Sequence, residues 1–186
     1  MKKQILTMLF VGLTTFISNA QSTVGGVKLE EKLSVEGKSL VLNGAGIREK
    51  YFMDLYVGSL YLSKKSSNDQ EIINGKESAA IKLNIISGMI TSKKMISAVN
   101  EGFENATNKN TASLKTKIDK FKGFFKDEIV KGDVFTIAFD GEEVHVSKNG
   151  TKKGSIDGYE FKKALFAIWL GKKPADDDLK KGMLGK

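Results

Sequence analysis

The sequence predicts a single α+β domain in which an antiparallel sheet is covered on one face by helices. Segments with alternating or β-branched apolar residues, typical of strands, occur in the first and the last part of the chain. Two segments with helical spacing of apolar residues lie between them, and another follows the last strands. This order of strands, two helices, strands and a helix is typical of α+β domains.

The first 20 residues predict a secretory signal peptide rather than a part of the fold. An apolar stretch over residues 5–17 follows two lysines, and small residues typical of a cleavage site end at Ala20. The stretch is too short to cross a bilayer, which needs about 20 apolar residues. We therefore expect cleavage near Ala20, export to a bacterial periplasm or the extracellular space, and a mature domain over residues 21–186.

The composition excludes several classes of function. The chain has no cysteine, which excludes disulfides, thiol catalysis and thiolate metal sites. Its net charge is +8, and two of these charges, Lys2 and Lys3, would leave with the signal peptide. The lysines are spread along the chain, so we expect a solvated basic surface and no nucleic-acid partner. No later segment is apolar enough to span a bilayer, so we expect no stable membrane insertion.

The predicted strands and connections of the first half follow from alternation and turn residues. Residues 21–26 are expected to form a loose tail, and residues 64–70 a polar loop. The expected strands are two short ones within residues 27–47, with a turn at Gly37, a long buried one over Tyr51–Ser63, and one over Ala79–Ser87.

Two consecutive helices are predicted in the middle of the chain. Apolar residues recur at helical spacing in both segments, and Thr91 or Ser92 can cap the first. These apolar positions are Met95, Val99 and Phe103, followed by Leu114, Ile118, Phe121 and Phe125.

Strands return over Asp133–Asp140 and on either side of Asn149–Gly150, a pair that strongly favours a hairpin turn. The last long helix is expected over Tyr159–Leu170, with Gly171 at its C-terminal cap. Pro174 is expected to open a final helical turn in which acids precede lysines, as the helix dipole favours.

Three features could suggest a catalytic or ion-binding site but have simpler interpretations. His145 is the only histidine; it alternates with two valines and is expected to face solvent from a strand. Asp176–Asp178 stand at a helix start, where they serve capping rather than a metal. The glycines of residues 43–48 are not followed by the helix and Lys-Ser/Thr pair of a phosphate loop. We expect no metal site and no cofactor.

Arg48 is the main candidate for a binding residue, because it is the only arginine in a chain rich in lysine. A guanidinium grips carboxylate or enolate oxygens with two parallel hydrogen bonds. Arg48 precedes an aromatic strand with Tyr51, Tyr56 and Tyr61. A surface salt bridge is the alternative to an anion clamp at the mouth of an apolar pocket.

Nearly the whole mature chain resembles the chalcone isomerase-like family, in its bacterial, secreted branch. The resemblance lies in "LNGAGIREK…DLYVGSLYL", "KGDVFTIAF…GTKKGSIDGYEF" and "KKALFAIWLGKKPADDDLKKGMLG". It implies an open-faced β-sandwich with a ligand cleft between the sheet and a layer of helices. Plant members close a flavanone ring, whereas other members bind fatty acids with an arginine and a tyrosine.

The resemblance places Arg48 at the family arginine and Tyr56 at the position that favours fatty-acid binding. The Tyr–x–x–Lys–x–x–x–Asn helix pattern of the plant enzymes is not found, because Lys93, Lys94 and Asn100 have the wrong spacing. A cation alone accelerates ring closure little when no groups position the reacting atoms. Binding an acyl chain needs only an apolar slot and one charged anchor.

Three hypotheses for the function remain. The first is a non-catalytic exported protein that binds a small apolar carboxylate, such as a fatty acid, at Arg48 and Tyr56. The second is an isomerase of the chalcone isomerase type, and the third a protein that acts through a protein partner. The first requires a turn or bulge between Glu49 and Asp54, because a straight strand would separate the two side chains by roughly 26 Å.

Overall fold

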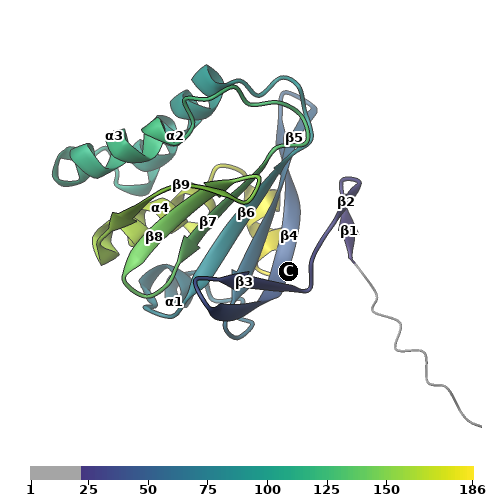
Figure 1. Ribbon diagram of the computed structural model, residues 1–186, viewed down its shortest axis with the longest axis horizontal. Coiled ribbons are helices and arrows are strands. Elements are labelled where there is room, and N and C mark those ends of the chain that lie inside the picture. The colour runs from purple at the N-terminus through teal and green to yellow at the C-terminus, as the bar shows by residue number, and fades with distance from the viewer. Residues whose placement is uncertain (1–21) are drawn as a thin grey trace, which may run out of the picture.

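The computed structural model describes residues 22–186, and it confirms the α+β fold. Residues 1–20, for which we predict a signal peptide, lie outside this range. Strands β3 to β9 form one antiparallel sheet in which each strand pairs with its neighbour in the sequence, and helices cover one face (Figure 1). The strands are β3 (Lys32–Val35), β4 (Lys38–Lys50), β5 (Met53–Leu62), β6 (Ala79–Ile85), β7 (Val134–Phe139), β8 (Glu143–Lys148) and β9 (Thr151–Asp157).

Alternation along the strands decides which side chains meet the helices. On β7, Phe135 and Ile137 belong to the main core between sheet and helices, whereas Ala138 faces the other side.

The helices are α1 (Asp69–Asn74), α2 (Ser92–Ala106), α3 (Lys115–Gly123), α4 (Tyr159–Leu170) and α5 (Asp177–Met183), with a 3₁₀ turn at Ala112–Leu114. Among the described residues, no helix is long and apolar enough to cross a membrane.

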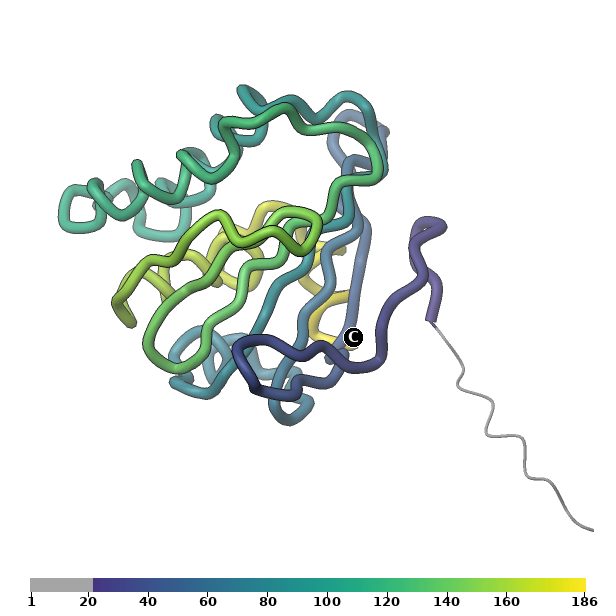
Figure 2. Tube along the Cα trace, viewed as in Figure 1, coloured from purple at the N-terminus to yellow at the C-terminus, as the bar shows by residue number. Residues whose placement is uncertain are grey.

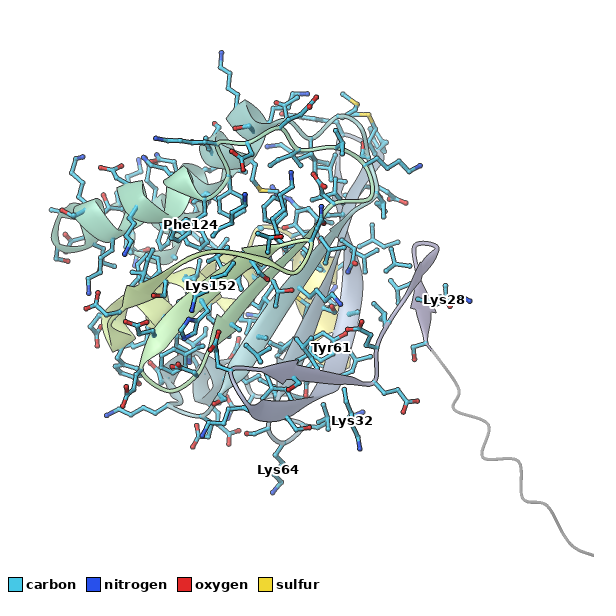
Figure 3. The ribbon with its side chains drawn as sticks, in the orientation of Figure 1. Lys28, Lys32, Tyr61, Lys64, Phe124 and Lys152 are labelled. Carbon is cyan, nitrogen blue, oxygen red and sulfur yellow. The ribbon has the colours of Figure 1, made fainter. Side chains whose placement is uncertain are left out.

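The opposite face of the sheet is partly covered by the first segments of the chain, which the sequence did not predict. β3 runs across the lower part of the sheet in Figures 1 and 2. Two contacts join the sheet to Glu30, which precedes β3. The Tyr61 hydroxyl donates to the Glu30 carbonyl at 3.0 Å, and Lys82 pairs with the Glu30 carboxylate at 2.7 Å. Figure 3 shows Tyr61 at this position. This cover buries apolar residues that an open face would expose.

The sequence predictions of local structure were confirmed for most elements and wrong for three. The expected loose tail contains a small hairpin of β1 (Thr23–Val24) and β2 (Val27–Lys28). The strand after Gly37 was predicted to be short, but β4 has 13 residues. The polar loop ends in helix α1, whose first amides are capped by the Asn68 side chain. In the tail and in the polar loop, the errors concern polar segments that form regular structure.

The predicted helices and hairpin turn are present. Thr91 caps α2, as predicted, by accepting a hydrogen bond from the Lys94 amide. α4 has the predicted bounds, Tyr159–Leu170. Asn149 and Gly150 form the β8–β9 turn with φ of 50° and 79°. α5 begins three residues later than predicted, because Asp176 rather than Pro174 caps its first turn.

A buried lysine on α4 fixes helix α1. The Lys162 ammonium donates to the carbonyl oxygens of Ile72, Ile73 and Gly75 at 2.6, 3.0 and 2.8 Å. These carbonyls lie at the end of α1, where no amide of the helix is available for them. Burial lowers the pKa of Lys162 to about 8. Lys162 therefore joins two helices at the lower end of the domain through charge-assisted hydrogen bonds.

The glycines of the "NGAG" segment allow α5 to lie directly on the sheet. A Cβ atom at Gly44 would be 2.2 Å from the carbonyl oxygen of Gly182, and one at Gly46 would be 3.0 Å from the Leu179 Cα. Gly182 is equally constrained, because its Cβ would be 2.5 Å from the Ala45 carbonyl oxygen. The segment is therefore a packing surface for backbone against backbone, rather than a phosphate loop.

Replacing Gly44 with alanine should destabilise the protein. The added methyl group overlaps with backbone atoms of α5, so we expect the free energy of unfolding to fall by about 2–4 kcal/mol in urea denaturation. Gly123→Ala is the matched control, since no atom lies within 4 Å of its Cβ at the end of α3. The control should raise stability by up to about 1 kcal/mol. Equal stability of Gly44→Ala and wild type would contradict the close packing of α5 on β4.

Candidate functional site

The structure brings Arg48 and Tyr56 together, as the sequence argument required. They are direct partners across the β4–β5 hairpin, so their side chains leave the same face of the sheet. The chain reverses at Tyr51 and Phe52, and the register shifts between Arg48 and Glu49. The predicted strand over Tyr51–Ser63 therefore starts two residues late, because its first two residues form the turn.

This turn has an unusual composition. Tyr51 and Phe52 have φ of 54° and 61°, in the left-handed region. Two-residue turns of this kind are normally formed by Asn-Gly or similar pairs, because bulky side chains disfavour positive φ. Both aromatic side chains are nevertheless in solvent, with 78 % and 97 % of their surface exposed. The turn is a strained feature of the backbone, with no buried contact to explain its aromatic residues.

Arg48 has no partner for its charge among residues 22–186. Its side chain is partly buried, and its Nε is a buried nitrogen without a hydrogen bond. No carboxylate within that range lies near enough for an ion pair. The guanidinium carbon lies 5.8 Å from the centre of the Tyr56 ring, which gives a cation–π contact. The alternative of a surface salt bridge is therefore wrong within the described structure.

Tyr56 supplies a hydroxyl group whose hydrogen is free to bind a ligand. The Trp169 indole nitrogen donates to the Tyr56 oxygen at 2.9 Å, and both side chains are buried. Indole N–H is a donor only, so the Tyr56 oxygen accepts in this bond. Among residues 22–186, the Tyr56 hydroxyl makes this hydrogen bond as an acceptor and none as a donor. Trp169 thus orients a hydroxyl donor beside the unpaired guanidinium.

These donors lie at the inner end of a cleft between the β4–β5 hairpin and α2. The cleft has a volume of about 290 Å³ and a largely apolar wall, which includes Met53, Leu55, Met89 and Ile90. Its remaining lining residues are Arg48, Lys50, Tyr51, Tyr56, Lys94, Met95, Ser97, Ala98 and Glu101. An apolar cleft with a few polar groups at one end is typical of sites for small organic ligands.

A much smaller cavity continues the cleft into the core. It has a volume of about 20 Å³, enough for about one water molecule. Arg48, Tyr56, Met95 and Ala98 line both spaces, so they form the boundary between them. Trp169 lines only the inner cavity. The anionic group of a ligand would therefore meet Arg48 and Tyr56 at this boundary.

Comparison with known proteins agrees with this architecture. The family model described as chalcone isomerase-like matches residues 21–185. The chain belongs to the chalcone isomerase-like family. No curated protein matches its sequence. Among solved structures it resembles a fatty-acid binding protein of Arabidopsis thaliana, with a TM-score of 0.63 and 17 % identity over 83 % of this chain and 96 % of that one. At this identity, the likeness establishes a chalcone isomerase-like fold.

Trp169 is the residue beside Arg48 and Tyr56 that the sequence did not identify. The sequence placed Trp169 only on the apolar face of the last long helix. The one available signal was that a buried tryptophan needs an acceptor for its N–H group. That signal does not say which acceptor it meets, because Tyr56 is 113 residues away in the chain.

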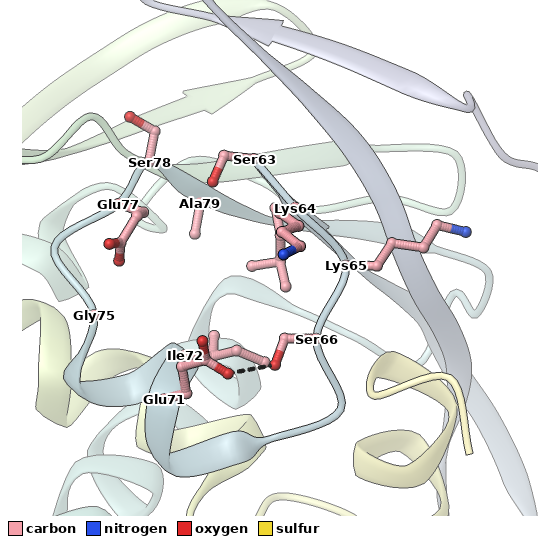
Figure 4. A pocket seen from close by; sticks show the side chains of 11 residues that line it. Ser63, Lys64, Lys65, Ser66, Glu71, Ile72, Gly75, Glu77, Ser78 and Ala79 are labelled. Atoms are coloured by element: carbon pink, nitrogen blue, oxygen red, sulfur yellow. Dashed lines mark hydrogen bonds between the residues drawn. The ribbon is translucent and has the colours of Figure 1, made fainter.

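A second cavity, at the other end of β5, lacks the features of a site. It has a volume of about 350 Å³ and lies between the β5–α1 connection and the start of β6 (Figure 4). In its wall, the Ser66 hydroxyl donates to Glu71 at 2.8 Å. Lys64 and Lys65 are exposed to solvent. No unpaired donor from a described residue converges on this cavity.

His145 does not face open solvent as predicted, although it does point away from the helices. Only 12 % of its side chain is exposed, because the β3–β4 hairpin lies over it. One ring nitrogen contacts Asp140 at 2.7 Å, and the other lies 3.8 Å from Glu36.

In residues 22–186 no group of His, Asp and Glu has a metal-binding arrangement. Asp176 caps α5 as predicted, by accepting from the Leu179 amide at 2.8 Å.

The contact of Asp140 with His145 predicts loss of stability in acid. Partial burial would raise the pKa of Asp140, but the amides of Glu143 and Glu142 and the His145 ring outweigh it and lower the pKa to about 2. The ionised carboxylate therefore stabilises the fold above the unfolded pKa of 3.8, and this contribution is lost as the pH falls to about 2.

The test compares wild type with Asp140→Asn in urea denaturation at several pH values. The difference in free energy of unfolding should shrink by about 2 kcal/mol between pH 5 and pH 2. A difference that stays constant over this range would contradict the lowered pKa of Asp140.

Proposed function

We propose that this protein is a non-catalytic binding protein for a small apolar carboxylate, such as a fatty acid. The observation that carries the proposal is the unpaired Arg48 guanidinium beside the Tyr56 hydroxyl at the inner end of an apolar cleft. The Arg48 guanidinium has five N–H donors and no partner among the described residues. The Tyr56 hydroxyl adds a donor on the same side. Buried side-chain nitrogens without a hydrogen bond are rare in proteins, and among the described residues they are Arg48 Nε and His145 Nδ1. The one on Arg48 lines the apolar cleft, where a ligand anion would supply its acceptor.

In the proposed complex the carboxylate accepts hydrogen bonds from Arg48 and Tyr56, and the acyl chain lies along the outer cleft. Each buried methylene of the chain contributes about 0.8 kcal/mol. The volume of about 290 Å³ is at the low end for ligand pockets. We therefore expect short or medium chains to bind best. The fatty-acid binding protein with a similar fold makes this ligand class the natural first choice.

Native mass spectrometry of the protein from its own host separates this proposal from the other hypotheses. A co-purifying carboxylate supports binding, chalcone turnover by an empty protein would support an isomerase, and a stable complex would support a protein partner. Export is part of the proposal. The same spectrum tests it, because cleavage near Ala20 gives a chain that begins at Gln21.

Substitution of Arg48 should weaken binding of a fluorescent fatty acid. We expect Arg48→Ala to raise Kd roughly 10- to 100-fold, because a charge-assisted hydrogen bond contributes about 1.5–3 kcal/mol. Arg48→Lys should weaken binding as much as Arg48→Ala does if the bidentate hydrogen bond is required. It should weaken binding less than Arg48→Ala if the positive charge alone is required. Lys64→Ala is the control, since it removes a positive charge from the far end of the sheet (Figure 3). Unchanged affinity in both Arg48 variants would refute the anion site.

Substitution of Tyr56 separates ligand contact from general stability. Tyr56→Phe keeps the ring near Arg48 but removes the hydroxyl, so Kd should rise about fivefold and stability should fall by about 1 kcal/mol. Tyr61→Phe is the matched control, because its hydroxyl also makes one buried hydrogen bond, to Glu30 on the other face. The control should lose similar stability and keep its affinity. Equal affinity of the two variants would exclude a contact between Tyr56 and the ligand.

A further inference from the structure

We propose that the β4–β5 turn and two neighbouring loops form an apolar edge that docks on the surface of a phospholipid bilayer containing anionic lipid. The apolar edge consists of Tyr51, Phe52, Met89 and Val130. These are the large apolar side chains that are exposed among residues 22–186, with exposed fractions of 78, 97, 44 and 49 %. Proteins normally expose such side chains singly rather than together.

The four residues lie at one end of the sheet, although they come from three separate connections. Strand pairing places the end of β6 beside the start of β5, since Tyr56 is the partner of Ile85. The amide of Gly132 donates to the Ile85 carbonyl at 2.8 Å, which brings the α3–β7 loop to the same place. Figures 1 and 2 show these connections meeting at the upper end of β4 and β5. The three connections therefore lie at the same end of the sheet.

The conformation of the turn argues that its aromatic residues are there for a contact outside the domain. Both residues of the turn have positive φ, which costs roughly 1–3 kcal/mol for bulky residues. Asn-Gly would form the same turn without this cost. Neither ring is buried in the domain, so the fold gains no packing from them. A strained, exposed and aromatic turn is best explained by a partner that receives the rings.

The neighbouring charges suit an anionic surface. The Lys50 ammonium lies 5.6 Å from the Tyr51 ring, and the Lys94 ammonium donates to the Met89 carbonyl at 3.0 Å. Lys93 and Lys131 flank the edge and are exposed. None of these four lysines forms an ion pair within residues 22–186. The acids in this region include Glu49 and Asp54, which face each other across the hairpin behind the turn, Glu101 in the cleft wall and Glu128 in the α3–β7 loop.

A bilayer fits this edge better than a folded protein partner does. A specific protein interface buries about 1,200–2,000 Å² over a broad surface, whereas the apolar edge has four exposed apolar side chains. Aromatic rings with adjacent lysines are typical of segments that enter the interfacial region of a membrane. The edge is too small to anchor the protein permanently, so docking is reversible and adds no membrane-spanning segment.

Docking in this orientation would place the mouth of the cleft against the lipid. Tyr51 and Met89 belong to both the apolar edge and the lining of the cleft. An apolar carboxylate partitions into bilayers, so a cleft that opens at the membrane surface can exchange it without passage through water. This last step rests on the proposed function, whereas the docking surface stands on the exposed residues alone.

Co-sedimentation with vesicles tests the inference. We expect the mature protein to bind vesicles of phosphatidylcholine with about one third phosphatidylglycerol better than pure phosphatidylcholine vesicles, and less strongly as salt is added. Phe52→Gly should weaken vesicle binding about tenfold, because a large apolar ring is lost. The same variant should raise Tm by about 2–4 °C, since glycine relieves the positive φ. Wild-type vesicle binding by Phe52→Gly, or no preference for anionic vesicles, would overturn the proposal.

Charge variants and a soluble ligand distinguish this proposal from the proposed function. Lys93→Ser/Lys131→Ser should weaken vesicle binding by about fivefold per lysine. Lys64→Ser/Lys65→Ser, with the same net charge but at the opposite end, should bind vesicles like wild type. An equal loss in both pairs would mean a non-specific charge effect and would also overturn the docking surface. Phe52→Gly should retain its affinity for a soluble fluorescent fatty acid, whereas Arg48→Ala should lose that affinity and still bind vesicles.

Discussion

The close contact of helix α5 with strand β4 is the constraint on which the site depends. Gly44, Gly46 and Gly182 leave no room for side chains, so the helix backbone lies against the strand backbone. Asp176 adds a second link, because one of its oxygens caps α5 and the other accepts from the Glu49 amide at 3.3 Å. Glu49 follows Arg48 at the point where the register of the hairpin shifts. The C-terminal segment thus holds the strand that carries the guanidinium.

The Tyr56–Trp169 hydrogen bond extends this arrangement from the sheet to the helix layer. It joins β5 to α4 at the bottom of the cleft, and it leaves the Tyr56 hydroxyl hydrogen directed away from the indole. The positions of Arg48, Tyr56 and Trp169 are therefore determined by three different elements that pack on one another. The packing of these elements holds the donors of the proposed site in place without a ligand.

The two ends of the domain differ in the contacts that they make. At the lower end, Lys162 donates to three carbonyls, and the Asn43 side chain bonds to Ser66 and Met183. At the upper end, an arginine lacks a partner among the described residues, and an aromatic turn is strained and exposed. Unpaired buried groups and strained backbone of this kind usually coincide with functional sites. Their location at one end is consistent with a binding cleft that opens there.

The sequence by itself determined the fold class and the helices α2, α3 and α4, because these follow from periodicity and composition. It also singled out Arg48 as a candidate, whose role in binding is a proposal. It did not determine that Tyr51 and Phe52 form a turn, because local preference opposes positive φ in aromatic residues. It also missed α1, the cover on the outer face and the role of Trp169. Each of these depends on contacts between residues far apart in the chain, such as the 113-residue separation of Trp169 and Tyr56. Only the packed structure decides such contacts, since no local pattern specifies which buried donor meets which acceptor.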